Sequence, residues 1–296
     1  MNVPLPPVFL NEDDYGQYSI IDGKQRLTTV HEFLYDQFPL VGLEVFQEAN
    51  GLTFSQLDRS LRSVLETRAS LRAIILLRLS DPLIKYHVFQ RLNTGGVRLN
   101  AQEVRNVTFT GSLNNRLQGI AENPEFGRML GVSPDAPEKS ALWKQMRDVE
   151  LVLRYFTLSD GWGTFAGSLG GAMNEYMAEH HGISEPELDS LNSRFDDAIR
   201  KVAVSFGNEA FRRWDPSRRL YGSQPLATLF DAQMIAVEGV QLDLLSAKSA
   251  ELQNGMRDLF IDEEFARSIA SQTNTPSFVR ARIQMAKSMV ERVVGA

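Results

Sequence analysis

Apolar residues recur at three- and four-residue intervals through the C-terminal two thirds of the chain, as on one face of a helix. The clearest sets are Leu142, Met146, Val149, Leu153 and Phe156, then Leu188, Leu191, Phe195, Ile199 and Val202, then Val279, Ile283, Ala286, Val290 and Val293. Glycine-rich turns, among them Gly161-Trp162-Gly163, separate such segments. Residues 111–296 are therefore predicted to form an all-helical body.

The first third of the chain has a mixed pattern. Tyr18-Ser19-Ile20-Ile21 is typical of a short strand that ends at the turn dipeptide Asp22-Gly23. The periodic residues Leu27, Val30, Leu34 and Phe38 predict a helix directly afterwards, and the apolar run from Leu71 to Leu79 predicts a buried strand. A helix opens at Asp81-Pro82, and capped helix starts are expected at Thr53, with a helix to about Thr67, and at Asn100. We predict an α+β fold class, with a small mixed head over residues 1–110.

Composition narrows the classes of function. A chain of 296 residues with 43% hydrophobic residues can bury a sizeable core, and with no cysteine it has no disulfide, thiol nucleophile or thiolate metal site. No apolar run approaches the length of a membrane-spanning helix, and the N-terminus lacks the pattern of a secretory signal, so a cytoplasmic protein is expected. A net charge of -6 and a pI near 5.4 argue against a protein that binds nucleic acid over its whole surface.

The segment Asp22-Gly23-Lys24-Gln25-Arg26 joins the predicted strand to the predicted helix. The first turn of a helix offers unpaired N–H groups and the positive end of the helix dipole, which suits a phosphate. Lys24, Arg26 and the Thr28 hydroxyl would add to such a site. Asp22 would serve as a Mg²⁺ ligand, a water-positioning base or a clamp on Arg26. The alternative is a capped helix whose basic first turn is only solvated.

A second polar segment runs from Phe89 to Leu99 and includes Arg91, Asn93 and Gly95. A helix end followed by a double glycine is commonly only a C-cap and a turn. Here, however, the arginine and asparagine crowd polar groups around the turn. The segment from Phe89 to Leu99 is therefore a second candidate for binding.

Together the two segments resemble the N-terminal domain of GmrSD-type modification-dependent restriction endonucleases, which is related to the ParB/sulfiredoxin-like fold. The family motif Asp-Gly-Gln-Gln-Arg followed by Leu-Thr-Thr is similar to Asp22–Thr29, and a second motif is similar to Phe89–Glu103, closed by Arg105-Asn106. The helix Arg147–Arg154 resembles part of the family's helical region less specifically.

The resemblance implies a module that binds and hydrolyses a nucleoside triphosphate with Mg²⁺ in DNA restriction or phage defence. That role falls on Asp22, Gly23, Gln25 and Arg26, with Asp22 and Arg26 as the expected catalytic residues. Further nucleotide contacts are expected from Lys24 and Thr28 of the loop and from Arg91, Asn93 and Gly95 of the second segment. Lys24 replaces a glutamine of the family motif, which puts turnover in question. The head is also shorter at its N-terminus than is usual in the family.

Many relatives carry an HNH nuclease domain, which needs a histidine base beside metal ligands. The four histidines are His31, His87, His180 and His181, and none lies in such a setting. Neither a nuclease site nor a metal site is therefore expected in this chain, and DNA cutting would require a nuclease partner protein.

DNA contact is the sequence-based hypothesis for Arg212, Arg213, Arg218 and Arg219, which surround Trp214 within eight residues. The alternative is a solvated loop whose arginines pair with nearby acids such as Asp215 and Glu209. The leading hypothesis for the whole chain is a nucleotide-binding, NTPase-like module. The rival is a non-catalytic protein that binds DNA or a partner and has a degenerate nucleotide site.

Overall fold

A computed structural model describes residues 5–92, 99–270 and 273–295 of the chain. The chain divides into two compact units, an N-terminal unit, Met1–Arg98, and a C-terminal unit, Leu99–Ala296. The α+β class is confirmed, with a small mixed sheet in the first unit and a helical second unit. The expected domain boundary after residue 110 stays a prediction. In the described part of the chain, no helix is both long and apolar enough to cross a membrane.

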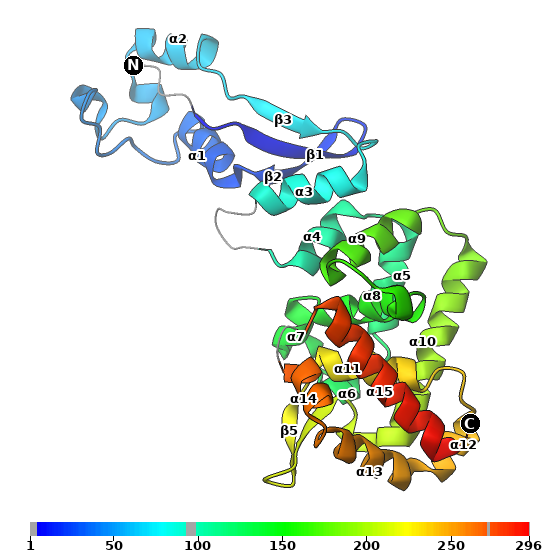
Figure 1. Ribbon diagram of the computed structural model, residues 1–296. Helices are drawn as coiled ribbons and strands as arrows, with labels where there is room; N and C mark the ends of the chain where they lie inside the picture. Colours follow the sequence, from blue (N-terminus) through cyan, green and yellow to red (C-terminus); the bar gives the residue numbers. More distant parts are fainter. Residues whose placement is uncertain (1–4, 93–98, 271–272, 296) are drawn as a thin grey trace. The chain divides into compact units, whose positions relative to one another are not determined.

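The N-terminal unit is built on a three-stranded sheet with the strand order β2-β1-β3 (Figure 1). Its elements are β1 (Val8–Asp14), β2 (Gln17–Asp22), α1 (Lys24–Leu34), α2 (Arg59–Thr67), β3 (Ala73–Leu76) and α3 (Pro82–Leu92). β1 pairs antiparallel with β2, with Leu10 opposite Ile20, and parallel with β3, with Val8 opposite Ala73. The central strand was not predicted, because the acidic and amide residues from Asn11 to Asp14 are unfavourable in strands.

Two predictions for this unit need correction. The strand near Leu71–Leu79 exists as β3 but is not buried: Ile74 and Ile75 are 40% and 42% exposed, because β3 is an edge strand whose faces the described residues leave largely open. The predicted capping box at Thr53 is present, but it caps a single 3₁₀ turn, Phe54–Gln56. Helix α2 begins only after Asp58, whose side chain accepts a hydrogen bond from Ser60 N.

The C-terminal unit consists mainly of helices (Figure 1). They are α4 (Ala101–Thr108), α5 (Ser112–Ala121), α6 (Pro124–Leu130), α7 (Ala141–Lys144), α8 (Arg147–Ser159), α9 (Leu169–Glu179), α10 (Glu185–Phe206), α11 (Ala227–Ala236), α12 (Leu242–Ala247), α13 (Ser249–Leu259), α14 (Glu263–Ala270) and α15 (Pro276–Val294). Helix α11 is buried from Thr228 to Ala236 and packs against α8 and α15. A cluster of aromatic rings, including Phe126, Phe195 and Phe230, fills the core.

The structure departs from the predicted C-terminal unit in two places. The periodic segment from Ser140 to Phe156 is two helices, because Met146 adopts a left-handed conformation with φ 52° and separates α7 from α8. The unit is also not purely helical: β4 (Arg212–Asp215) and β5 (Leu220–Pro225) form an antiparallel hairpin. The predicted helices around Phe195 and Ile283 are confirmed as α10 and α15.

Candidate functional site

The predicted strand, turn and helix are formed by β2, Gly23 and α1. Gly23 has φ 96°, a left-handed conformation that favours glycine, and its carbonyl accepts the first helical hydrogen bond from Leu27 N at 2.9 Å. A Cβ atom at this position would lie 2.5 Å from Val8 Cγ1 and 3.3 Å from Arg26 Nη2. The backbone conformation and the contact with Val8 therefore account for the glycine without a ligand.

Arg26 links the turn to the segment before β1. Its Nη2 donates to Asp22 Oδ2 at 2.6 Å, and its Nη1 donates to the carbonyl oxygens of Pro6 and Pro7 at 2.6 and 3.1 Å. The side chains of Arg26 and Asp22 are 28% and 32% exposed. Of the three roles that the sequence left open for Asp22, the clamp on Arg26 is the one that corresponds to an observed contact.

The first turn of α1 is open to solvent beside this clamp. Lys24, Gln25 and Thr28 are exposed, whereas Gly23 is buried. Within residues 5–92 and the other described ranges, no side chain caps the helix, and its first turn contains no acidic residue. The leading N–H groups and the Lys24 ammonium are thus presented together at the positive end of the helix dipole.

The second predicted segment begins in α3. Arg91 is exposed in the last turn of this helix, which packs against β2 (Figure 1). Among the described residues, no hydrogen bond or ion pair joins Arg91 to the Asp22–Arg26 loop. Asn93 and Gly95 lie outside the described residues.

The end of the second motif has a packing role in the C-terminal unit. Asn100 caps α4 by accepting from Gln102 N at 2.8 Å and Glu103 N at 3.1 Å, as predicted. Arg105 is only 1% exposed, and its Nε donates to Asn174 Oδ1 at 2.7 Å. Its Nη2 donates to the Gly170 carbonyl at 3.2 Å, which ties α4 to α9.

The arginines considered for DNA contact lie on the β4–β5 hairpin. Arg213, Arg218 and Arg219 are exposed, whereas Arg212 donates to the carbonyl oxygens of Asn208 and Ser223. Arg218 is 3.9 Å from Asp215, and its side chain is 80% exposed. The solvated-loop alternative is therefore half right: the segment is ordered as a hairpin, and most of its guanidinium groups remain accessible.

Trp214, which was considered for base stacking, already has partners. Its ring centroid lies 4.9 Å from that of Tyr221, and the Arg257 guanidinium lies 5.1 Å from the Trp214 centroid. The indole therefore helps to hold the hairpin against α13. A base would have to displace these contacts or use another face of the hairpin.

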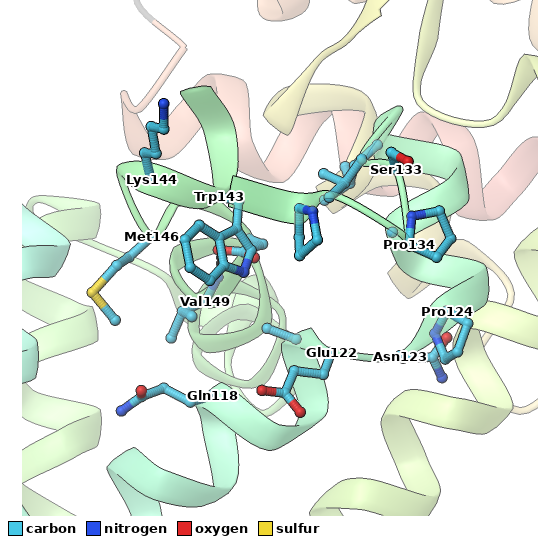
Figure 2. A pocket seen from close by; sticks show the side chains of 16 residues that line it. Gln118, Glu122, Asn123, Pro124, Ser133, Pro134, Trp143, Lys144, Met146 and Val149 are labelled. Carbon is cyan, nitrogen blue, oxygen red and sulfur yellow. Dashed lines mark hydrogen bonds between the residues drawn. The ribbon is translucent and has the colours of Figure 1, made fainter. Parts of the chain in front are cut away.

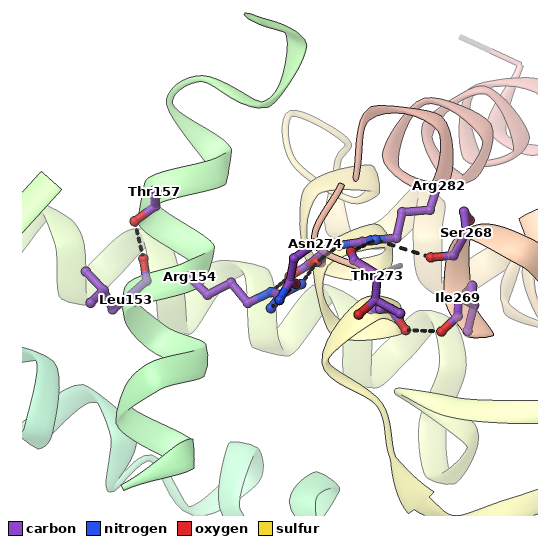
Figure 3. A network of polar contacts seen from close by, with 10 residues as sticks. Leu153, Arg154, Thr157, Ser268, Ile269, Thr273, Asn274 and Arg282 are labelled. Carbon is purple, nitrogen blue, oxygen red and sulfur yellow. Dashed lines mark hydrogen bonds and ion pairs between the residues drawn. The ribbon is translucent and has the colours of Figure 1, made fainter. Parts of the chain in front are cut away.

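A buried ionic cluster in the C-terminal unit was not predicted from the sequence. Asp231 of α11 is bound by Arg154 of α8, through contacts of 2.5 and 2.6 Å, and by Arg282 of α15 at 2.6 Å. The carboxylate and the Arg282 side chain are both 0% exposed, and burial lowers the pKa of Arg282. Figure 3 shows Arg154 and Arg282 converging on this point. Arg154 and Arg282 lie in helices with several charged residues, which ordinarily indicate a solvated face, so only the three-dimensional packing reveals the cluster.

The first part of the chain corresponds to a known class of protein. Residues 1–110 match the family model described as GmrSD restriction endonuclease, N-terminal domain, and this part of the chain belongs to that family. The match indicates a module of a restriction system. Comparisons with curated proteins and with solved structures give no match.

Proposed function

We propose that the N-terminal unit binds a nucleoside triphosphate with Mg²⁺ and acts as the nucleotide-dependent module of a DNA restriction or phage-defence system. We propose further that its sheet and helices form a ParB/sulfiredoxin-like fold. The observation that carries the proposal is the first turn of α1, which has no side-chain cap and no acidic residue and presents an exposed Lys24. A phosphate at this turn would receive both backbone N–H groups and an ammonium.

The clamp leaves donors and acceptors for this role. A guanidinium has five N–H donors, and the three contacts of Arg26 leave others to face a phosphate. Asp22 uses Oδ2 for the clamp, so Oδ1 can orient a water molecule or face Mg²⁺. When bound with the nucleotide, Mg²⁺ would neutralise charge on the phosphate oxygens. Gln25 and Thr28 lie within one turn, and Arg91 with Asn93 and Gly95 of the second motif would complete the contacts.

The proposal is tested by titrating the chain with fluorescent ATP and GTP analogues in the presence of Mg²⁺. Lys24→Ala should weaken binding about tenfold or more, because it removes a charge-assisted contact from an exposed position. Arg68→Ala is the matched control, since it removes an exposed positive charge at the end of α2 in the same unit. Equal affinities of the wild type and Lys24→Ala would contradict the proposal.

Arg26→Ala is a less direct test, because it also releases the Pro6 and Pro7 carbonyl oxygens. Lys24→Gln is more informative about turnover, because it restores the residue of the family motif at an exposed position. A phosphate-release assay on the wild type and Lys24→Gln would show whether the lysine affects hydrolysis separately from binding.

A second function, a non-catalytic protein that binds DNA or a partner, is favoured by two observations. Asp22 and two carbonyl oxygens hold Arg26, and the hairpin presents exposed arginines at positions 213, 218 and 219. This alternative predicts only background phosphate release and a DNA affinity that falls steeply with salt. A nuclease partner protein would then perform the cutting.

A further inference from the structure

A large cavity lies in the C-terminal unit, and its lining includes no residue of the β4–β5 hairpin or of the Asp231 cluster. It has a volume of about 660 Å³, within the range of small-molecule sites. Its walls come from the end of α5, from α6, from the loop before α7, and from the start of α8. Figure 2 shows the Trp143 indole projecting from α7 towards Gln118 and Glu122 of the α5 end.

The break between α7 and α8 creates one wall of this cavity. Met146, which lines it, has φ 52°, a conformation that costs an L-residue about 1–2 kcal/mol. A continuous helix would avoid this cost. The break instead turns Trp143 and Lys144 over the cavity, and Trp143 stays 42% exposed. Strained backbone of this kind is concentrated at functional sites.

Asp148 is the most deeply buried polar side chain of the cavity wall. It is 6% exposed, and its Oδ1 accepts from Val149 N at 2.9 Å. Burial raises the pKa of this carboxyl group. Within the described residues, no cationic side chain forms an ion pair with it. Asp148 therefore has acceptor capacity left over, at a position where burial disfavours the charged form of its carboxyl group.

Other polar groups of the wall are partly committed. Asn123 accepts from Glu125 N and Phe126 N and donates to Asp196, and the Gln118 amide donates to Asn106. Glu122 and Lys144, by contrast, are exposed at the cavity. The cavity thus combines an aromatic face, two carboxyl groups and one ammonium at its edge.

We propose that this cavity binds an amino-bearing nucleobase (cytosine, adenine or guanine) as part of a nucleotide or a DNA strand. The base lies against Trp143, its exocyclic amino group donates to Asp148, and Lys144 contacts the phosphate. Base stacking on an aromatic side chain is tolerant of sequence, whereas carboxylate acceptors select the amino group. Uracil and thymine present a carbonyl oxygen at the corresponding edge, which the carboxylates repel. This site is independent of the triphosphate site proposed at α1.

Tryptophan fluorescence provides the direct test. The full chain is titrated with CMP and with UMP, and then with oligodeoxycytidine and oligothymidine. CMP should quench the emission and bind at least about tenfold more tightly than UMP. Tighter binding of oligodeoxycytidine than of CMP identifies a DNA strand as the source of the base, and equal affinities identify the free nucleotide. Absence of quenching by CMP, AMP, GMP and oligodeoxycytidine overturns the proposal.

Variants locate the binding. Trp143→Phe should remove the CMP-dependent quenching, and Trp143→Ala should lower affinity about tenfold or more. Trp162→Phe, in the short 3₁₀ turn after α8, is the matched control and should keep the response. Asp148→Asn should reduce the preference for CMP over UMP. Quenching that survives Trp143→Phe, or a preference unchanged in Asp148→Asn, contradicts the assignment. Lys24→Ala should leave all of these responses intact, so the two nucleotide sites are tested separately.

Discussion

The two units of the chain are stabilised in different ways. In the C-terminal unit, long helices bury aromatic and aliphatic side chains around α11, and the buried cluster of Asp231 with Arg154 and Arg282 joins α8, α11 and α15. Among the described residues of the N-terminal unit, few apolar side chains are buried, the larger ones being Val8, Leu57, Tyr86 and Phe89, and much of the exposed apolar surface lies here. This unit depends more on backbone pairing, a glycine turn and polar clamps.

The difference shows that the Asp22–Arg26 loop is held by a few specific contacts, whereas the helices of the C-terminal unit depend on extensive packing between residues distant in sequence. A substitution in the N-terminal unit should therefore act through one turn or clamp. A substitution in the core of the other unit should affect several helices together. The predictions below test this contrast in order of expected effect.

The largest effect is expected for Asp231→Ala. Removing the carboxylate leaves Arg154 and Arg282 buried without their common partner, which should lower the free energy of unfolding by about 3–5 kcal/mol. Chemical denaturation followed by far-UV circular dichroism, which reports helix content, provides the measurement. Asp160→Ala is the control, because it breaks the partly exposed pair with Arg194 and should cost about 1 kcal/mol or less. Similar losses in the two variants would refute the role given to the cluster.

Gly23→Ala should have the next largest effect, about 2 kcal/mol, confined to the N-terminal unit. The new Cβ would lie 2.5 Å from Val8 Cγ1. The alanine residue would also have to adopt the positive φ of Gly23, which is unfavourable for a residue with a side chain. Gly16→Ala is a matched control, since it has φ +72° but no atom within 4 Å of the added Cβ. Hydrogen exchange resolved by segment should show a greater loss of protection for Gly23→Ala. Equal effects would mean that the contact with Val8 is unimportant.

Asn100→Ala should cost about 1 kcal/mol in the C-terminal unit. The side chain accepts from two N–H groups at the start of α4, and it also donates to the Gln145 carbonyl at 2.8 Å. Thermal unfolding measures the loss. Asn100→Asp is the informative control, because it keeps the cap and removes only the contact with Gln145. The capping role would be wrong if the two variants were equally destabilised.

The smallest effect, and the one that depends on pH, concerns Asp148. Because burial raises its pKa in the folded chain above the ordinary value of 3.8, the folded state binds the proton more tightly than the unfolded state. Its contribution to stability is therefore present at low pH and is lost as the pH rises through the raised pKa. Asp148→Asn should have a higher melting temperature than the wild type at pH 7, and this difference in melting temperature should shrink as the pH falls towards 3.8. Melting temperatures measured across this range would show a constant difference if the carboxyl group were not perturbed.

Sequence patterns predicted the elements whose signals are local. The turn at Asp22-Gly23, the cap at Asn100 and the helices around Phe195 and Ile283 all depend on residues a few positions apart. The nucleotide-binding roles assigned to the loop stay predictions. The contact of Asp22 with Arg26 was one of the roles suggested from the sequence, and the structure describes it beside an open first turn of α1.

Features that depend on distant contacts were missed. The polar strand β1 is stabilised by partners on both sides, and the break at Met146 has no glycine or proline to indicate it. The hairpin β4–β5 was missed because its arginines suggested a loop. Asp231 is the only charged residue of α11, and its partners come from two other helices. Such pairings cannot be read from spacing along the chain.

The parallel pairing of β1 with β3 also affects the order in which the chain can fold during synthesis. The β1–β2 hairpin can form as soon as it leaves the ribosome, but the other edge of β1 must wait for Ala73–Leu76. At about 5–20 residues per second, that wait lasts several seconds, during which Val8 to Asn11 offer an unpaired strand edge. Nascent chains would therefore be exposed to strand-to-strand aggregation, or to capture by a chaperone, over this interval.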